Sequence, residues 1–231
     1  SAAEGEKEYV AGLRLGVDTD TQDTTGAVLE ERPVSGMHQD VDRVLERFRG
    51  EILQVPPMYS AVKVRGEKLY QLARKGVEVE RKPRPVTIYS LELEEQESPR
   101  DFVLRVRCSK GTYVRTLCHD IGAALGCGGT MYSLRRTSAC GFTEREAVTL
   151  DALARAAERG EAQNLLLPVE SLFAGYPALT IDGKALFLAR NGNPFRCGAA
   201  DGTWRVRGPD GAFLLLGRCE GGVMKTVKSF F

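Results

Sequence analysis

Residues 101–126, DFVLRVRCSKGTYVRTLCHDIGAALG, pass from a strand through a tight turn directly into a helix. In the first part apolar side chains alternate with polar ones, which predicts a strand with one buried face. Its buried residues are expected to be Phe102, Leu104, Val106 and Cys108. In the second part the apolar residues have helical spacing, and Gly126 is placed to end the helix. These helical core positions are Leu117, Ile121, Ala124 and Leu125.

Two cations lie on either side of the predicted helix start. Lys110 precedes it and Arg115 falls in its first turn, with Thr112 expected as the N-cap and Tyr113 close behind. The positive end of the helix dipole lies at this terminus, so cations there are unfavourable unless an anion binds among them. The turn is therefore predicted to bind an anion.

Outward from this stretch, residues 7–17 are predicted to form a strand that pairs with residues 27–34 across the polar loop DTDTQDTTG. The aspartates of this loop lack the glycine and terminal glutamate of an EF-hand, so a solvated or capping loop is expected instead of a calcium site. Helices are predicted near residues 41–48, 69–73 and 149–158, and strands at 84–95 and 101–109. Past a boundary near residue 172, short apolar runs between glycines indicate a small β barrel or sandwich.

Composition indicates a soluble globular protein of 231 residues with 42% hydrophobic residues and a net charge of +1. Nucleic-acid binding must therefore depend on local clusters, and residues 63–84 carry eight Lys or Arg against three Glu. The six cysteines have no paired spacing, which favours reduced thiols in the cytoplasm and gives no zinc motif. No apolar run is long enough to predict a membrane span.

Four strings in order along the chain closely resemble one family, the bacterial tRNA pseudouridine-55 synthases or TruB family. They are KEYVAGLRLGVDTDTQDTTG (7–26), VPPMYSAVKVRGEKLYQLARKGVEVERKPRPVTIY (55–89), CSKGTYVRTLCHDIGAALGCGG (108–129) and SLRRTSACGF (133–142). An ordered series is more specific than any single motif. The resemblance implies an α+β fold with a mixed, largely antiparallel central sheet flanked by helices over residues 1–171. NGNPFR (191–196) resembles the family's small PUA-like RNA-binding domain, assigned to 172–231.

The family converts a uridine in the T-loop of tRNA to pseudouridine after flipping the base into a pocket. By resemblance Tyr9 stacks on the uracil and Arg115 pairs with a catalytic aspartate. The remaining substrate-binding residues implied by the resemblance are Tyr113, Leu134, Lys63, Met58, Tyr59 and Lys110. Those expected to contact the RNA backbone are Arg65, Lys68, Arg74, Lys75, Arg81, Lys82, Arg84, Arg135 and Arg136. Neither a metal nor an organic cofactor is implied, and the partner is the T-arm of tRNA in the cytoplasm.

One departure from the family concerns the catalytic aspartate. In the family it lies in a Gly-rich Leu-Asp-Pro segment upstream of the KEY motif, whereas only Ser1–Glu6 precede Lys7 here. None of Asp18, Asp20, Asp23 and Asp120 has that context. Arg115 is therefore expected to have no anion in this chain, which alone is predicted to be inactive. Alternatives are a tRNA-binding protein without catalysis, a dyskerin-type RNA-guided synthase, and an α+β interaction protein without RNA. The intact protein is expected to be a monomer without membrane contact.

Overall fold

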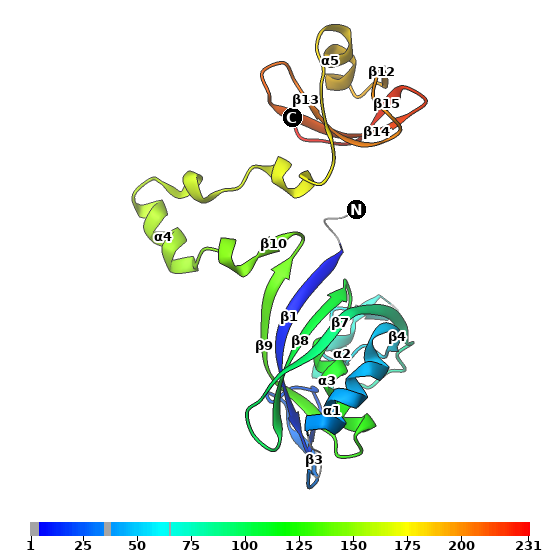
Figure 1. Cartoon of the computed structure of the whole chain (residues 1–231), viewed down its shortest axis with the longest axis vertical. Coiled ribbons are helices and arrows are strands. Elements are labelled where there is room, and N and C mark those ends of the chain that lie inside the picture. Colours follow the sequence, from blue (N-terminus) through cyan, green and yellow to red (C-terminus); the bar gives the residue numbers. More distant parts are fainter. Residues whose placement is uncertain (1–4, 35–37, 65) are drawn as a thin grey trace. The chain divides into compact units, whose positions relative to one another are not determined.

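The computed structural model describes residues 5–34, 38–64 and 66–231. The described chain divides into two compact units, residues 5–147 and residues 148–231 (Figure 1). The sequence predicted a boundary near residue 172. The packing instead places residues 148–171 in the second unit. The division into a domain of residues 1–171 and a PUA-like domain of residues 172–231 stays a prediction.

Six strands of the described part of the first unit form one antiparallel sheet in the order β10-β9-β1-β8-β7-β4. Their bounds are β1 Glu6–Leu15, β4 Gly50–Gln54, β7 Arg84–Gln96, β8 Asp101–Ser109, β9 Gly129–Ala139 and β10 Phe142–Thr143. β1 and β8 alternate buried and more exposed residues as predicted, because side chains along a strand point to opposite faces. The expected α+β class with a largely antiparallel sheet is confirmed.

Two helices cover one face of this sheet, α1 His38–Leu45 and α3 Val114–Ala124 (Figure 1). Both bury an apolar stripe against the strands, and the core between them contains Phe102, Leu104, Leu117 and Ile121. After α1 the chain forms a 3-10 turn, Glu46–Phe48, and enters β4 through Gly50 at φ 86°. The helix predicted over residues 41–48 is therefore present, with its last turn tightened.

α3 lies unusually close to the beginning of β9. A Cβ atom on Gly122 would be 2.2 Å from the backbone nitrogen of Gly129, and one on Gly129 would be 2.8 Å from the Cys118 carbonyl oxygen. Both positions therefore need glycine, because any side chain would separate the helix from the strand. This contact sets the distance between α3 and the sheet, and therefore the position of the first turn of α3 relative to the strands.

The first unit also contains several shorter strands and helices. A hairpin on either side of the aspartate-rich loop is present, but it is formed by the short strands β2 Val17–Thr19 and β3 Val28–Glu31. The expected pairing of the whole strand over residues 7–17 with residues 27–34 was wrong, because β1 pairs with β8 and β9 instead. β5 Lys63–Val64, β6 Glu67–Lys68 and α2 Leu69–Arg74 lie in the basic segment, and a 3-10 turn, Glu144–Glu146, follows β10.

In the second unit five strands of the described chain form a sheet in the order β11-β13-β14-β15-β12, in which only β11 and β13 are parallel neighbours. The strands are β11 Ala178–Thr180, β12 Phe195–Arg196, β13 Gly202–Arg207, β14 Phe213–Glu220 and β15 Val223–Ser229. The helical elements are α4 Leu150–Glu158, the 3-10 turns Ala162–Leu165 and Val169–Phe173, and α5 Gly183–Arg190. The strand-rich character predicted for this region is confirmed, whereas α5 was not predicted.

The 3-10 turn Val169–Phe173 contacts this second sheet through ion pairs and aromatic packing. Glu170 accepts hydrogen bonds from Arg205 at 3.2 Å and from Arg207 at 2.6 Å. The ring of Phe173 lies 5.8 Å from that of Phe213 and 5.5 Å from that of Phe230. These contacts hold the 3-10 turn Val169–Phe173, which spans the predicted boundary, against the second sheet.

Candidate active site

The turn between β8 and α3 differs by one residue from the predicted cap. The helix begins at Val114, and Tyr113 is its N-cap in an extended conformation. The hydroxyl of Thr112 donates to the Ser109 carbonyl at 2.9 Å, closing a turn in which Gly111 has φ 85°. Thr112 as N-cap was therefore wrong, since its hydroxyl points back into the turn.

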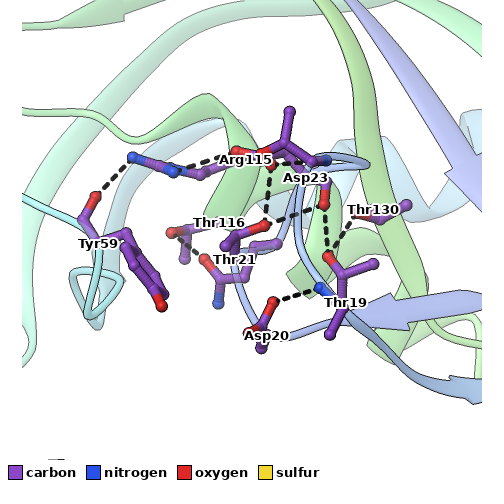
Figure 2. A network of polar contacts seen from close by, with 11 residues as sticks. Thr19, Asp20, Thr21, Asp23, Tyr59, Arg115, Thr116 and Thr130 are labelled. Carbon is purple, nitrogen blue, oxygen red and sulfur yellow. Dashed lines mark hydrogen bonds and ion pairs between the residues drawn. The ribbon is translucent and has the colours of Figure 1, made fainter. Parts of the chain in front are cut away.

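Arg115 lies in the first turn of α3 between two acceptors from distant parts of the chain (Figure 2). One guanidinium nitrogen donates to the Tyr59 carbonyl at 2.7 Å, and the other is 3.1 Å from Asp23 Oδ2. The Arg115 side chain is 24% exposed and that of Asp23 is 16% exposed, so this ion pair is partly shielded from solvent. The expectation that Arg115 has no anion in this chain was wrong, because Asp23 is its partner.

The loop before β3 holds Asp23 in place by hydrogen bonding to its carboxylate. Asp23 Oδ1 accepts from the Thr21 hydroxyl at 2.8 Å and from the backbone and hydroxyl of Thr25. Burial by itself raises the pKa of this carboxyl. The hydrogen bonds from Thr25 and Thr21, together with the charge of Arg115, outweigh burial and hold the pKa below its usual value. Asp23 is therefore an anion at neutral pH.

The same loop is fastened to β9 and to α3. Gln22 has φ 64°, and the Thr116 hydroxyl donates to its side-chain oxygen at 2.7 Å. The backbone nitrogen of Thr24 donates to the Met131 carbonyl at 2.9 Å. Thr19 contributes a hydroxyl that donates to the Asp23 carbonyl at 2.8 Å (Figure 2). Asp23 is largely shielded from solvent, so the expectation of a solvated loop is wrong for this residue. Its carboxylate closes a turn within the loop by accepting from the Thr25 N–H, and the helix α3 has Tyr113 as its N-cap.

The predicted base-stacking residue, Tyr9, lies on β1 among the core residues and is 8% exposed. Its cross-strand neighbour is Arg136, whose guanidinium carbon lies 5.6 Å from the centre of the tyrosine ring. Leu134 pairs with Ala11 on the same strands and is 46% exposed. Because cross-strand pairs share a face, Tyr9, Leu134 and Arg136 all project from the side of the sheet that α3 covers.

The basic segment is partly neutralised by its own acidic residues. Lys75 pairs with Glu67 at 3.4 Å, and Arg81 pairs with Glu78 at 3.1 Å while also donating to the Pro56 carbonyl at 3.3 Å. Lys68 and Arg74 both lie against the ring of Tyr70, with charge-to-centroid distances of 5.6 and 5.5 Å.

A hollow of about 220 Å³ lies in the same segment. Lys63, Lys82 and Arg84 line it. Elsewhere, Arg135 forms an ion pair with Glu144. Arg65 lies outside the described residues, so its predicted backbone contact has no structural account.

Two further polar residues were not predicted from the sequence. Gln54, at the end of β4, contacts the backbone of Tyr113, and Thr116 contacts Gln22. Both are buried polar side chains, and buried polar groups need hydrogen-bond partners. Their burial is visible only in the structure, because neither residue belongs to a sequence motif of its own.

Among the described residues, no group of three or more His, Cys, Asp or Glu side chains is placed to hold a metal ion. Cys118 is fully buried, which raises the pKa of its thiol to about 12, so it does not supply a thiolate at neutral pH. Within the described chain, no helix is both long and apolar enough to cross a membrane.

Comparison with solved structures defines the class of protein. The chain matches a Cbf5-Nop10-Gar1 complex with a TM-score of 0.69 and 26% identity, over 100% of this chain and 68% of that one. It also matches an H/ACA ribonucleoprotein bound to a substrate RNA containing 2'-deoxyuridine, with a TM-score of 0.68, 23% identity and the same coverage. The fold is that of the pseudouridine synthases.

Sequence comparisons give the family. Residues 1–114 match the model of the TruB family pseudouridylate synthase N-terminal domain, and residues 115–174 match the tRNA pseudouridylate synthase B C-terminal domain. The tRNA pseudouridine synthase B of Azoarcus sp. is 45% identical over 96% of this chain and 73% of that protein. The protein of the same name from Escherichia coli O1:K1 is 38% identical over 94% of this chain and 73% of its own length. The chain belongs to the TruB family, whose members are isomerases.

Proposed function

We propose that this protein converts the uridine at position 55 in the T-loop of tRNA to pseudouridine. The observation that supports this most strongly is the position of Arg115, which the Tyr59 carbonyl and Asp23 hold in the turn that matches the family motif. The reaction breaks the bond between the ribose and N1 of uracil, joins the ribose to carbon 5, and exchanges the carbon-5 hydrogen for a proton at N1. Atoms and electrons balance without a cofactor.

The roles proposed for the side chains are those that the resemblance to the family implies. The target base must be flipped from the T-loop into a pocket, where Tyr9 stacks on it and Tyr113 and Leu134 form the walls. Met58 and Tyr59 belong to the segment beside the substrate. Tyr9 also removes the proton from carbon 5.

The nucleophile is an aspartate in a Leu-Asp-Pro context, which none of the aspartates in these 231 residues has. A guanidinium has five N–H donors, and Arg115 uses one bond to Asp23 and one to Tyr59, so donors remain for a second carboxylate. Arg115 therefore bridges Asp23 and the catalytic aspartate.

RNA binding is assigned to the basic residues between 63 and 84, with Lys110, Arg135 and Arg136, which contact phosphates of the T-arm. The ion pairs of Lys75 and Arg81 can be exchanged for phosphate on binding, because exposed pairs contribute little stability. The substrate places the protein in the cytoplasm.

Release of tritium from tRNA labelled at carbon 5 of uridine tests this function. The protein expressed from its complete reading frame and the 231-residue chain are compared on a T-arm substrate and on the same substrate with cytidine at position 55. A product that carries the Leu-Asp-Pro segment should release tritium and form pseudouridine at position 55 only. The 231-residue chain alone should bind the tRNA without releasing tritium. Tritium release by neither protein, or release from another position, contradicts the proposal.

A tRNA-binding role without catalysis is the second candidate, because the basic residues between 63 and 84 would serve it equally well. An in-frame Leu-Asp-Pro segment upstream of residue 1 would exclude it. An RNA-guided role is less well supported, because identity is 38–46% to stand-alone tRNA pseudouridine synthases B and 23–26% to the Cbf5-type structures.

A further inference from the structure

Gln54 binds both backbone polar groups of Tyr113, the residue that begins α3. Its side-chain oxygen accepts from the Tyr113 nitrogen at 3.0 Å, and its amide nitrogen donates to the Tyr113 carbonyl at 3.3 Å. Gln54 is 1% exposed, so these hydrogen bonds are made away from solvent. Tyr113 is extended, with φ −101° and ψ 105°, and the amide of Gln54 pairs with it as a neighbouring strand would.

This contact holds Tyr113 from outside the helix. The Tyr113 carbonyl also accepts the first bond of α3, from Leu117 at 3.0 Å, whereas its N–H lies ahead of the helix and has no helical acceptor. Gln54 therefore satisfies a backbone donor that would otherwise be lost at a partly buried helix end. The N–H and C=O of Tyr113 belong to two successive peptide groups, so holding both restricts φ and ψ of this residue and thereby the direction of its Cα–Cβ bond.

The segment that contains Gln54 also holds Arg115. Gln54 reaches Tyr113, and five residues later the Tyr59 carbonyl receives the Arg115 guanidinium at 2.7 Å. Pro56 and Pro57 lie between these two anchors and stiffen the chain there. A single rigid segment thus sets the positions of residues 113 and 115 together.

We propose that Gln54 is a positioning residue for the isomerisation, acting through the backbone of Tyr113 on the placement of the Tyr113 ring and of Arg115. The inference rests on the proposed function. Gln54 contacts neither base nor ribose in this account, so its loss should slow the chemical step and leave tRNA affinity nearly unchanged. A purely structural role would instead change the global stability and affect binding and turnover together.

Two substitutions separate these roles. Gln54→Met has a similar length, no hydrogen-bond donor and only a weakly accepting sulfur. Gln54→Glu introduces a carboxyl group that, when protonated, offers one donor and one acceptor as the amide does, and when ionised places a second acceptor against the Tyr113 carbonyl. Gln96→Met, on the exposed end of β7, is the matched control.

In the complete protein, Gln54→Met should lower the single-turnover rate of tritium release about 10- to 100-fold, as expected when catalytic groups are misplaced. The tRNA Kd should stay within about twofold, because the phosphate contacts are untouched. Gln54→Glu should recover relative to wild type as the pH falls from about 8 to about 6, since burial favours the protonated carboxyl. This pH comparison is made within one folded protein, so it remains informative if Gln54→Met is unstable.

Amide hydrogen exchange in the 231-residue chain gives a readout that does not depend on activity. Exchange at Tyr113 should be faster in Gln54→Met by about tenfold, while core amides such as that of Leu104 are unchanged. An active wild-type protein with an unimpaired Gln54→Met variant, or a Gln54→Glu variant without pH rescue, overturns the positioning role alone. A wild-type complete protein that releases no tritium overturns the proposed function and this inference with it.

Discussion

The ion pair between Arg115 and Asp23 was predictable from the sequence only in part. Helix electrostatics predicted that the cation in the first turn of α3 needs an anion, and this is confirmed by the contact with Asp23. The partner could not be identified, because 92 residues separate the two positions and nothing in the loop spacing points to α3. Sequence resemblance assigned this anion to another segment, whereas the structure supplies one within the chain.

The Asp23 carboxyl gives a pH-dependent prediction. Its folded pKa lies below the usual value of about 3.9, so it stabilises the fold above that pH, and this contribution is lost as pH falls through the folded pKa. Asp23→Asn should therefore lower the free energy of unfolding at pH 7 by about 1.5–3 kcal/mol, the range for hydrogen bonds to charged groups. Urea denaturation at pH 7 and pH 3 measures this.

The difference between wild type and Asp23→Asn should shrink at pH 3. Asp20→Asn is the control for disturbance of the same loop, because its partner is the Ala27 amide and not a cation. An equal difference between wild type and Asp23→Asn at both pH values contradicts the role of the ionised carboxylate.

The contacts of buried amide and hydroxyl side chains could not be predicted from the sequence. Tyr9, Tyr113 and Leu134 were selected because they occupy motif positions that resemble a family. Gln54 and Thr116 act on the backbone or side chain of another residue, and such contacts leave no motif of their own in one sequence. A buried glutamine in a strand is the kind of residue that structure reveals and spacing does not.

Secondary structure was predictable where periodicity was strong. β1, β8, α3 and α4 lie where the alternation or the helical spacing placed them. α5 was not predicted because it is a short helix that begins at Gly183 and is followed by Asn191 and Gly192, and such residues are typical of turns. The order of the strands was not derivable, since pairing of β1 with both β8 and β9 depends on contacts about 100 residues apart.

The contact between α3 and β9 supports a prediction about the helix. Gly122→Ala should destabilise the protein by about 1–3 kcal/mol, because the added methyl group has no room against Gly129. Helix propensity alone predicts the opposite sign, a gain of about 1 kcal/mol. Thermal or urea denaturation decides between them.

Ala123→Gly, at the exposed neighbouring position of α3, measures the propensity effect in the same helix. It should cost about 1 kcal/mol. A stabilised Gly122→Ala variant would contradict the close packing of α3 on β9.

For the molecule as a whole, the net charge gives no sign of the RNA-binding surface that we propose. The chain carries +1 overall, yet four cations, Lys63, Arg81, Lys82 and Arg84, line one hollow with a single acidic residue, Glu80. Binding of tRNA should weaken steeply with salt, and Lys82→Ala or Arg84→Ala should each make the slope of log K against log salt shallower by about 0.7–0.9. Filter binding across a salt series measures these slopes.

Arg43→Ala, on the exposed side of α1, removes the same charge away from the basic segment and is the control. Its slope should equal that of the wild type. Salt-insensitive tRNA binding, or equal slopes for all variants, would contradict the assignment of phosphate contacts to residues 63–84.

The most direct test of the central claim is tritium release from carbon 5 of uridine 55 by the complete protein with Arg115 replaced by alanine. Arg115 contacts Asp23 and the Tyr59 carbonyl. In the proposed mechanism it also pairs with the catalytic carboxylate, so Arg115→Ala should abolish release while tRNA still binds. Tritium release at the wild-type rate by Arg115→Ala would contradict the account.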